Sequence, residues 1–143
     1  MKLPLLLSAL LLSAPPALAD DFLYMVCEMK GTETTMTLPS GQVISEGPLV
    51  VNSLRVKIDL KEQKMRSHKD PVWAVISVKG NQIIQNTQIN DGGITGHISG
   101  FMPLNPPGPA SINNWFKRGS EYQVIRGNGQ CQEIDPSAWN AQS

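Results

Sequence analysis

The chain has 143 residues, of which 12 are basic and 12 acidic, so its formal net charge is zero. A balanced charge gives no long-range attraction to phosphates or to anionic lipid, which argues against a nucleic-acid-binding protein. The length fits one domain of ordinary size that is large enough to bury a core.

The first 19 residues have the pattern of a cleaved export signal. Lys2 precedes a leucine-rich run at 3–12, and prolines and a small-residue A-L-A site at 17–19 follow. The apolar run is shorter than the roughly 20 residues that span a bilayer, and no cysteine for lipid attachment follows the site. We expect a signal peptide at 1–19 and a mature protein that is periplasmic or extracellular, with no membrane span.

Cys27 and Cys131 are the two cysteines of the chain, and both remain after such a cleavage. Exported thiols tend to pair, and two cysteines allow a single intramolecular pairing. Two free buried thiols or a redox pair are the alternatives, and the redox pair lacks C-x-x-C spacing. We expect a structural disulfide that ties the last strand to the first.

The mature chain shows short apolar runs separated by turn signals about every eight to twelve residues, which is typical of an all-β sandwich or barrel. A first strand is predicted at 22–29, where Leu23, Met25, Cys27 and Met29 share one face. A period of two places such residues on one side of a sheet.

The next segments predict a hairpin and a long strand. Residues 34–39 and 42–45 flank a Ser-Gly turn, and Glu-Gly-Pro at 46–48 is expected to break the chain. Residues 49–60 form the clearest strand, because apolar and charged side chains alternate strictly at 55–60 and indicate one buried face.

Residues 72–79 are nearly all β-formers and are apolar on both faces, which predicts the central strand. The Gln- and Asn-rich segment 82–90 is expected to be paired on both sides; at an edge it would instead offer a strand for another chain. A strand at 94–101 carries two glycines, which are typical of the bends in a closing barrel.

Four prolines at 102–111 exclude a central strand there and predict an ordered loop or an extended polyproline segment. Residues 112–119 follow as a short helical turn or an edge strand. Residues 120–127, a turn at Asn128-Gly129 and residues 130–134 complete the sheet. Residues 135–143 are expected to form a flexible tail. The chain therefore predicts one domain at 20–134, a small antiparallel barrel or sandwich of about 7–9 strands.

Side chains that carry catalysis are few. His68 lies in a basic cluster at 61–69, which is expected to be a solvated hairpin tip, and His97 lies in a glycine-rich strand. Neither has the neighbours of a metal site. The sequence G-H-I-S-G at 96–100 places Ser99 one residue late for a nucleophile elbow. No catalytic residue, metal or cofactor is predicted.

Residues 102–116 are the candidate recognition element. Pro106 and Pro107 stiffen the predicted loop, which lowers the entropy lost on binding. Trp115 and Phe116 at its end are of the type that anchors interfaces. The alternative is that both aromatic side chains cap the barrel core beneath the loop.

The order of these features resembles a loose group of small exported bacterial β proteins without assigned activity. The shared features are an early cysteine strand, V-x-I-D-L at 56–60, the glycine-broken strand at 94–101 and G-x-C at 129–131. This resemblance covers most of the mature chain and implies fold more than function.

The C-terminal part is similar to that of periplasmic inhibitors of animal-type lysozyme. Trp115, K-R-G at 117–119 and Cys131 would be the matching positions. The chain is longer than those inhibitors, and the Ser-Gly loop that they insert into the lysozyme cleft is not identifiable in it.

We therefore expect an exported, non-catalytic binding module. Its ligand would be a small apolar molecule in the barrel mouth, or a protein partner at 102–116. The alternative is an inhibitor of a lysozyme or protease that acts through 102–116, and an enzyme comes third. A hollow interior would favour ligand binding, whereas a filled core with a protruding rigid loop would favour inhibition.

Overall fold

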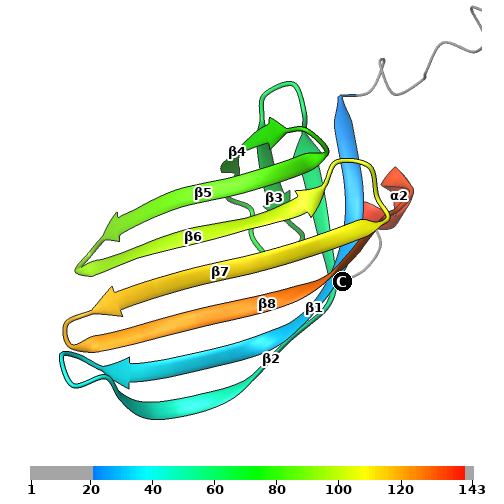
Figure 1. The fold of residues 1–143 in the computed structure, drawn as a ribbon. Helices are drawn as coiled ribbons and strands as arrows, with labels where there is room; N and C mark the ends of the chain where they lie inside the picture. The colour runs from blue at the N-terminus through cyan, green and yellow to red at the C-terminus, as the bar shows by residue number, and fades with distance from the viewer. Residues whose placement is uncertain (1–20, 141–143) are drawn as a thin grey trace, which may run out of the picture.

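A computed structural model describes residues 21–140, which form an all-β, closed antiparallel barrel in which each strand pairs with the next and β8 pairs with β1 (Figure 1). The prediction of a small antiparallel barrel is confirmed. The predicted signal peptide at 1–19 lies outside the described residues. The elements are β1 (Phe22–Thr37), β2 (Gln42–Asp59), β3 (Lys64–Ser67), β4 (Ala74–Lys79), β5 (Gln82–Asp91), β6 (Ile94–Pro103), β7 (Gly108–Arg118), β8 (Glu121–Glu133) and the short helix α2 (Pro136–Trp139).

The predicted disulfide joins the first and last strands. Cys27 on β1 and Cys131 on β8 are register partners, are bonded to each other and are fully buried. They are 104 residues apart in the sequence. The bond therefore closes the barrel covalently at the same place where the β1–β8 ladder closes it by hydrogen bonds.

The core lies beside this bond. The predicted alternation on β1 is confirmed at Met25, Cys27 and Met29, which all point inward. On β2 the inward side chains are Val56 and Ile58, as predicted. The fully assembled core consists of Met25, Cys27, Met29, Val56, Ile58, Ile76, Ile83, Ala110 and Cys131.

β2 runs through Gly47 and Pro48 without interruption, so the predicted chain break is wrong. Pro48 pairs with Thr32 of β1, and within residues 21–140 no strand pairs with its other side. Proline is tolerated on such an edge, because no second neighbour needs its missing N–H.

The prediction of a loop over residues 102–111 is also wrong, because the loop is much shorter. β6 continues to Pro103 and β7 starts at Gly108, so only 104–107 form a turn. Pro109 fits a strand because this part of β7 pairs with β8 alone; the pairing with β6 starts at Ser111. Residues 112–118 pair on both sides and are neither helical nor an edge. The predicted turn at Asn128-Gly129 is also wrong, because β8 runs through both residues and they pair with β1.

β4 is not the central strand that its composition predicts. It pairs with the four-residue β3 at Lys64–Val75 and Met65–Ala74, and nothing covers its outer face, so Val75 is 76% exposed. Strand propensity reflects side-chain fit to a pleated surface. It does not fix the position of a strand in the sheet.

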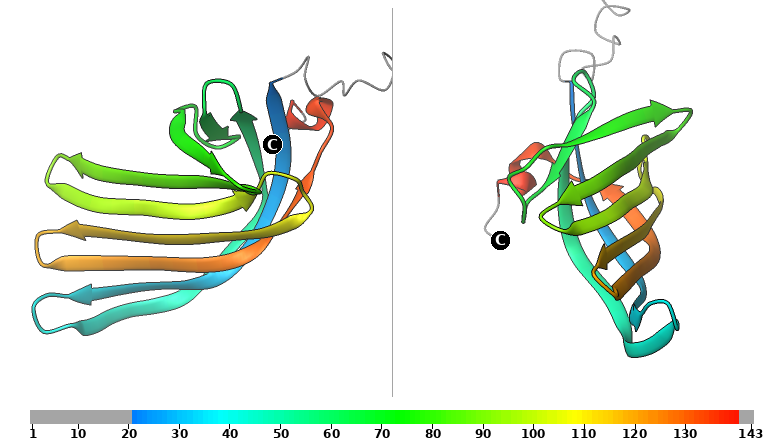
Figure 2. Two further views of the ribbon diagram at one scale, coloured as in Figure 1. Left: turned by 45° about the horizontal axis from the view of Figure 1, so that its top comes forward. Right: turned by 90° about the vertical axis from the view of Figure 1, so that its left-hand side faces the viewer.

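The barrel closes at one end only (Figure 2). The short strands β3 and β4 bridge β2 and β5 at that end, where β2 joins β3 from Val56 onward. In the part of the chain that the structure describes, residues 42–54 pair with β1 alone and 86–91 with β6 alone. The other end is therefore an open, curved sheet with two free edges, and 82–90 is half interior and half edge.

Within the segment 135–143, which the sequence predicts to be a flexible tail, the structure contains the short helix α2; residues 141–143 lie outside the description. Asp135 caps α2: its carboxylate accepts hydrogen bonds from the amide of Ser137 at 2.9 Å and from its hydroxyl at 2.7 Å. Trp139 at the end of the helix packs against Tyr24 of β1, with ring centroids 6.3 Å apart. The helix therefore lies against the outer face of the closed end.

The cap predicts that α2 loosens in acid. The hydroxyl of Ser137, and then its amide, hold the pKa of Asp135 below the ordinary value of 3.8. The cap thus stabilises α2 above that value and is lost as the pH falls through the lowered pKa. We expect the indole N–H resonance of Trp139 to move toward its unstructured position over this range. Asp135→Ala should show the moved resonance already at neutral pH; a resonance that does not respond to either change would contradict the role of the cap.

Candidate ligand-binding cavity

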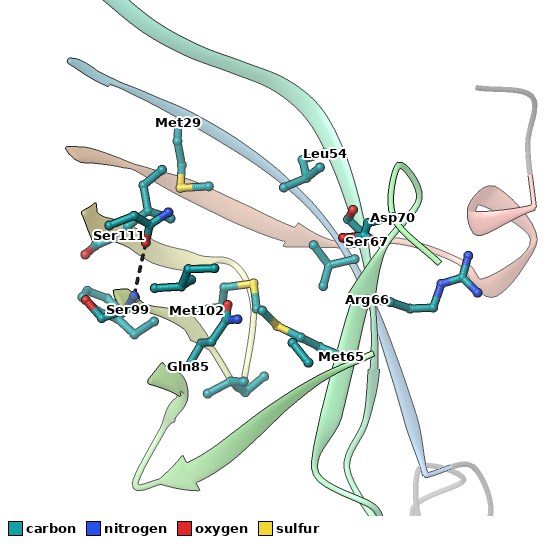
Figure 3. A pocket seen from close by; sticks show the side chains of 18 of the residues that line it. Met29, Leu54, Met65, Arg66, Ser67, Asp70, Gln85, Ser99, Met102 and Ser111 are labelled. Carbon is teal, nitrogen blue, oxygen red and sulfur yellow. Dashed lines mark hydrogen bonds between the residues drawn. The ribbon is translucent and has the colours of Figure 1, made fainter. Parts of the chain in front are cut away.

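A cavity of about 260 Å³ lies inside the barrel, next to the core (Figure 3). Its lining is mainly apolar and comes from strands far apart in the sequence. The principal apolar side chains are Met29, Leu54, Met65, Ile98, Met102 and Ile112. Methionine is flexible and polarisable, so a lining with three of them adapts to irregular shapes.

Strand alternation places these side chains. Met65 faces Ile58 across the β2–β3 ladder and shares its inward direction. The next residue, Arg66, points away from the cavity toward α2, as Figure 3 shows. On β6, two inward positions are glycines, Gly96 and Gly100, and a side chain at either would meet the backbone of β7. The absence of a side chain at these positions lets the backbones of β6 and β7 approach closely.

Two side-chain amides add polarity to the lining. Asn114 accepts a hydrogen bond from the amide of Ser99 at 3.2 Å through its carbonyl oxygen. Its NH₂ group makes no hydrogen bond within residues 21–140, and neither does the side chain of Gln85, which Figure 3 shows beside Met102. A molecule in the cavity would thus meet an apolar surface and hydrogen-bonding groups on β5 and β7.

The segment that joins β3 to β4 borders the cavity. Asp70, Val72 and Ala74 contribute to its lining, and Asp70 accepts a hydrogen bond from the amide of Val72 at 3.0 Å. β3 and β4 pair at only two positions, so few backbone hydrogen bonds hold the barrel wall together here, and we call this part the thin wall.

A second hollow, of about 410 Å³, lies near the open end on the inner side of the sheet. Its lining combines an aromatic ring, an aliphatic side chain and hydrogen-bonding or charged groups. These residues are Thr35, Ile94, Phe116, Arg118, Glu121 and Gln123.

The residues of the predicted recognition loop are separated in the structure. Pro106 and Pro107 lie in the 104–107 turn, whereas Trp115 and Phe116 lie within β7 and point to opposite faces. Phe116 faces the second hollow, and Trp115 stacks on Tyr122 outside, with ring centroids 5.7 Å apart. Neither ring belongs to the core, so the structure does not place them as caps of that core.

The two histidines are apart from the cavity. Nδ1 of His68 accepts the backbone N–H of Arg55 at 3.0 Å, and His97 hydrogen bonds to the side chain of Asn86 on the outer face. In the described range, no group of three or more His, Cys, Asp or Glu side chains is placed to hold a metal ion.

Comparison of the chain with protein-family models, with characterised proteins and with solved structures gave no match. Over residues 21–140, no helix has the length and hydropathy needed to cross a membrane. The function is therefore argued from the cavity and the surface alone.

Proposed function

We propose that this protein is a non-catalytic binding protein that holds a small, mostly apolar molecule inside its barrel. The cavity of about 260 Å³ between Met29, Met65, Met102 and Ile112 is the observation that carries the proposal. The interior of an eight-stranded barrel is either filled by side chains or wide enough to hold one small ligand. Ligand sites are in general concave and apolar, with a small number of polar groups that fix orientation.

The polar groups define the chemistry of the ligand further. Gln85 and Asn114 offer amide N–H donors at the cavity, and Gln85 also offers an acceptor. None of the lysines in residues 21–140 lines the cavity, and Arg66 points its side chain away from it. An uncharged molecule with one carbonyl or hydroxyl group on an apolar body matches this lining best.

The inhibitor hypothesis has less support from the geometry. It needs a rigid element that protrudes between 102 and 116, and this segment is strand except at 104–107. The hollow interior, in contrast, is the feature that we expect of a ligand carrier.

Filling the cavity tests the proposal. Ile98→Phe adds volume to a side chain that lines it, and we expect the affinity for the uncharged fluorophore N-phenyl-1-naphthylamine to fall about tenfold or more, equivalent to about 1.4 kcal/mol. The measurement is a fluorescence titration of the oxidised protein.

Ile84→Phe is the matched control, because Ile84 follows the inward Ile83 on β5 and does not line the cavity. It should bind like the parent chain. Equal affinities for all three proteins, or no binding by the parent chain, would contradict a ligand site in this cavity.

A further inference from the structure

The outer face of the closed end gathers cations and exposed apolar side chains. The outer patch is defined by three cations, Lys57 of β2 and Lys64 and Arg66 of β3, and by the apolar side chains of Val72 and Trp73 before β4, Val75 of β4 and Trp139 of α2. Val75 faces Lys64 across the β3–β4 ladder, and Arg66 faces Lys57 across the β2–β3 ladder. The patch thus continues from β4 across β3 to β2 and α2.

Apolar side chains project from one side of the patch. Val75 is 76% exposed and Val72, in the preceding connection, is 69% exposed; they are the two most exposed large hydrophobic residues of the described chain. Trp73 lies between them in the sequence. The sheet leaves these aliphatic groups in water, which is unfavourable unless another surface covers them.

The cations of the patch lack acidic partners. Lys57 and Arg66 stand directly opposite each other, an arrangement of like charges that weakens a sheet. None of Lys57, Lys64 and Arg66 forms an ion pair within residues 21–140, and Nε of Arg66 is buried without a hydrogen-bond partner. Asp59 is the register partner of Lys64, but its carboxylate instead accepts a hydrogen bond from the backbone N–H of Glu62.

Aromatic rings hold these cations in place without neutralising them. Nζ of Lys64 lies 4.9 Å from the ring centroid of Trp73. The guanidinium of Arg66 lies between Trp73, at 6.0 Å, and Trp139, at 5.6 Å. Cation–π contacts fix the charges at the surface and leave them positive.

We propose that the outer patch docks the protein onto a bilayer surface that contains anionic lipid. Tryptophan is enriched at the level of the lipid headgroups, and lysine and arginine beside it are attracted to anionic headgroups. Val72 and Val75 supply the apolar contact with the acyl boundary. An acidic protein partner would satisfy the cations but would not require two exposed valines beside them.

Net charge alone hides this surface. The whole chain is neutral, and the basic cluster at 61–69 is expected from the sequence to be a solvated tip. In the structure Lys64 and Arg66 lie on β3 within the outer patch. Val72 also lines the cavity. The docked protein would therefore present its thin wall to the lipid. Docking itself does not depend on the proposed ligand.

Vesicle flotation of the ligand-free, oxidised protein tests docking. We expect binding to vesicles of phosphatidylcholine with phosphatidylglycerol, at least about tenfold weaker binding to phosphatidylcholine alone, and weaker binding as salt screens the charges. Lys64→Glu combined with Arg66→Glu, and Val72→Glu combined with Val75→Glu, should each reduce binding about tenfold or more.

The controls change the same residue types elsewhere. Lys117→Glu with Arg126→Glu changes exposed cations of β7 and β8, and Val43→Glu changes an exposed valine at the open end. Both should float like the parent chain, and so should Ile98→Phe, which separates docking from the proposed ligand site. A thermal melt confirms folding, and Lys64→Gln with Arg66→Gln replaces any charge-reversal variant that does not fold.

Three results would overturn the proposal. The first is the absence of flotation with anionic vesicles, including the case in which the protein is a dimer that buries Val75. The second is binding that the patch variants leave unchanged. The third is full displacement by free glycerol phosphate, which would indicate a site for a single anion and not a bilayer surface.

Discussion

Replacing Cys27 and Cys131 with serine is expected to lower the free energy of unfolding by about 4–5 kcal/mol. The bond closes a loop of 104 residues in the unfolded chain, and the chain-entropy treatment assigns about 4.7 kcal/mol to a loop of about this length. Urea denaturation of the oxidised parent chain and of the double variant measures the difference.

The control for this effect is the reduced parent chain, which should unfold like the double variant. Reduction removes the bond and leaves the β1–β8 ladder and every other side chain in place. A loss below about 1 kcal/mol would mean that the unfolded chain already keeps its ends together, so that the cross-link removes little entropy.

Gly129→Ala is expected to prevent normal closure of the barrel, with a loss of more than about 4 kcal/mol or no folding at all. A Cβ at Gly129 would lie 1.8 Å from the carbonyl oxygen of Glu28 on β1. Backbone cannot move aside as the end of a side chain does, and Glu28 lies in the β1–β8 ladder opposite Gln130, the neighbour of Gly129. The substitution therefore forces β1 and β8 apart beside the disulfide.

Gly47→Ala is the matched control for Gly129→Ala. Gly47 also lies in a strand, but a Cβ there would meet nothing within 4 Å. We expect its midpoint in a thermal or urea melt to stay close to that of the parent chain. Similar losses for both variants would show that backbone entropy, and not the approach of β1 to β8, decides the effect.

The sequence predicts much of the fold because its signals are local. The alternation at Met25, Cys27 and Met29 and at Val56 and Ile58 indicates which side chains face inward, and the structure confirms it. The two cysteines predict that the first and last strands are joined, but they do not distinguish the closed barrel of the structure from a sandwich. The sequence does not predict the lengths of the strands. Pro48 and Pro109 do not break their strands, because each pairs with a strand on one side only and no strand on the other side needs the missing N–H.

The cavity was beyond prediction from the sequence. Met29, Met65 and Met102 come from three strands, and no spacing in the chain relates them. They meet because β3, four residues long, brings Met65 against the far side of the barrel. Neighbouring residues on a strand face opposite sides of the sheet. Because Trp115 and Phe116 are neighbours on β7, this rule excludes that both contact the same partner surface.

The outer patch illustrates a related limit. Charge balance is a property of the whole chain, whereas Lys57 and Arg66 become neighbours only through the β2–β3 register. Likewise, composition places 72–79 in the interior, whereas in the structure Val75 lies on the outer face of β4 and is 76% exposed.

The unequal strand lengths divide the molecule into a closed end, which contains the elements that hold the fold together, and an open end, which does not contain them. The disulfide, the core and the bridging strands all lie at the closed end, while the connection between β5 and β6 projects from the other. A peptide tag or a dye-labelled cysteine pair inserted at Gly92 and Gly93 would therefore sit far from everything that holds the chain together. The β5–β6 connection is therefore a suitable site for immobilising the protein on a surface.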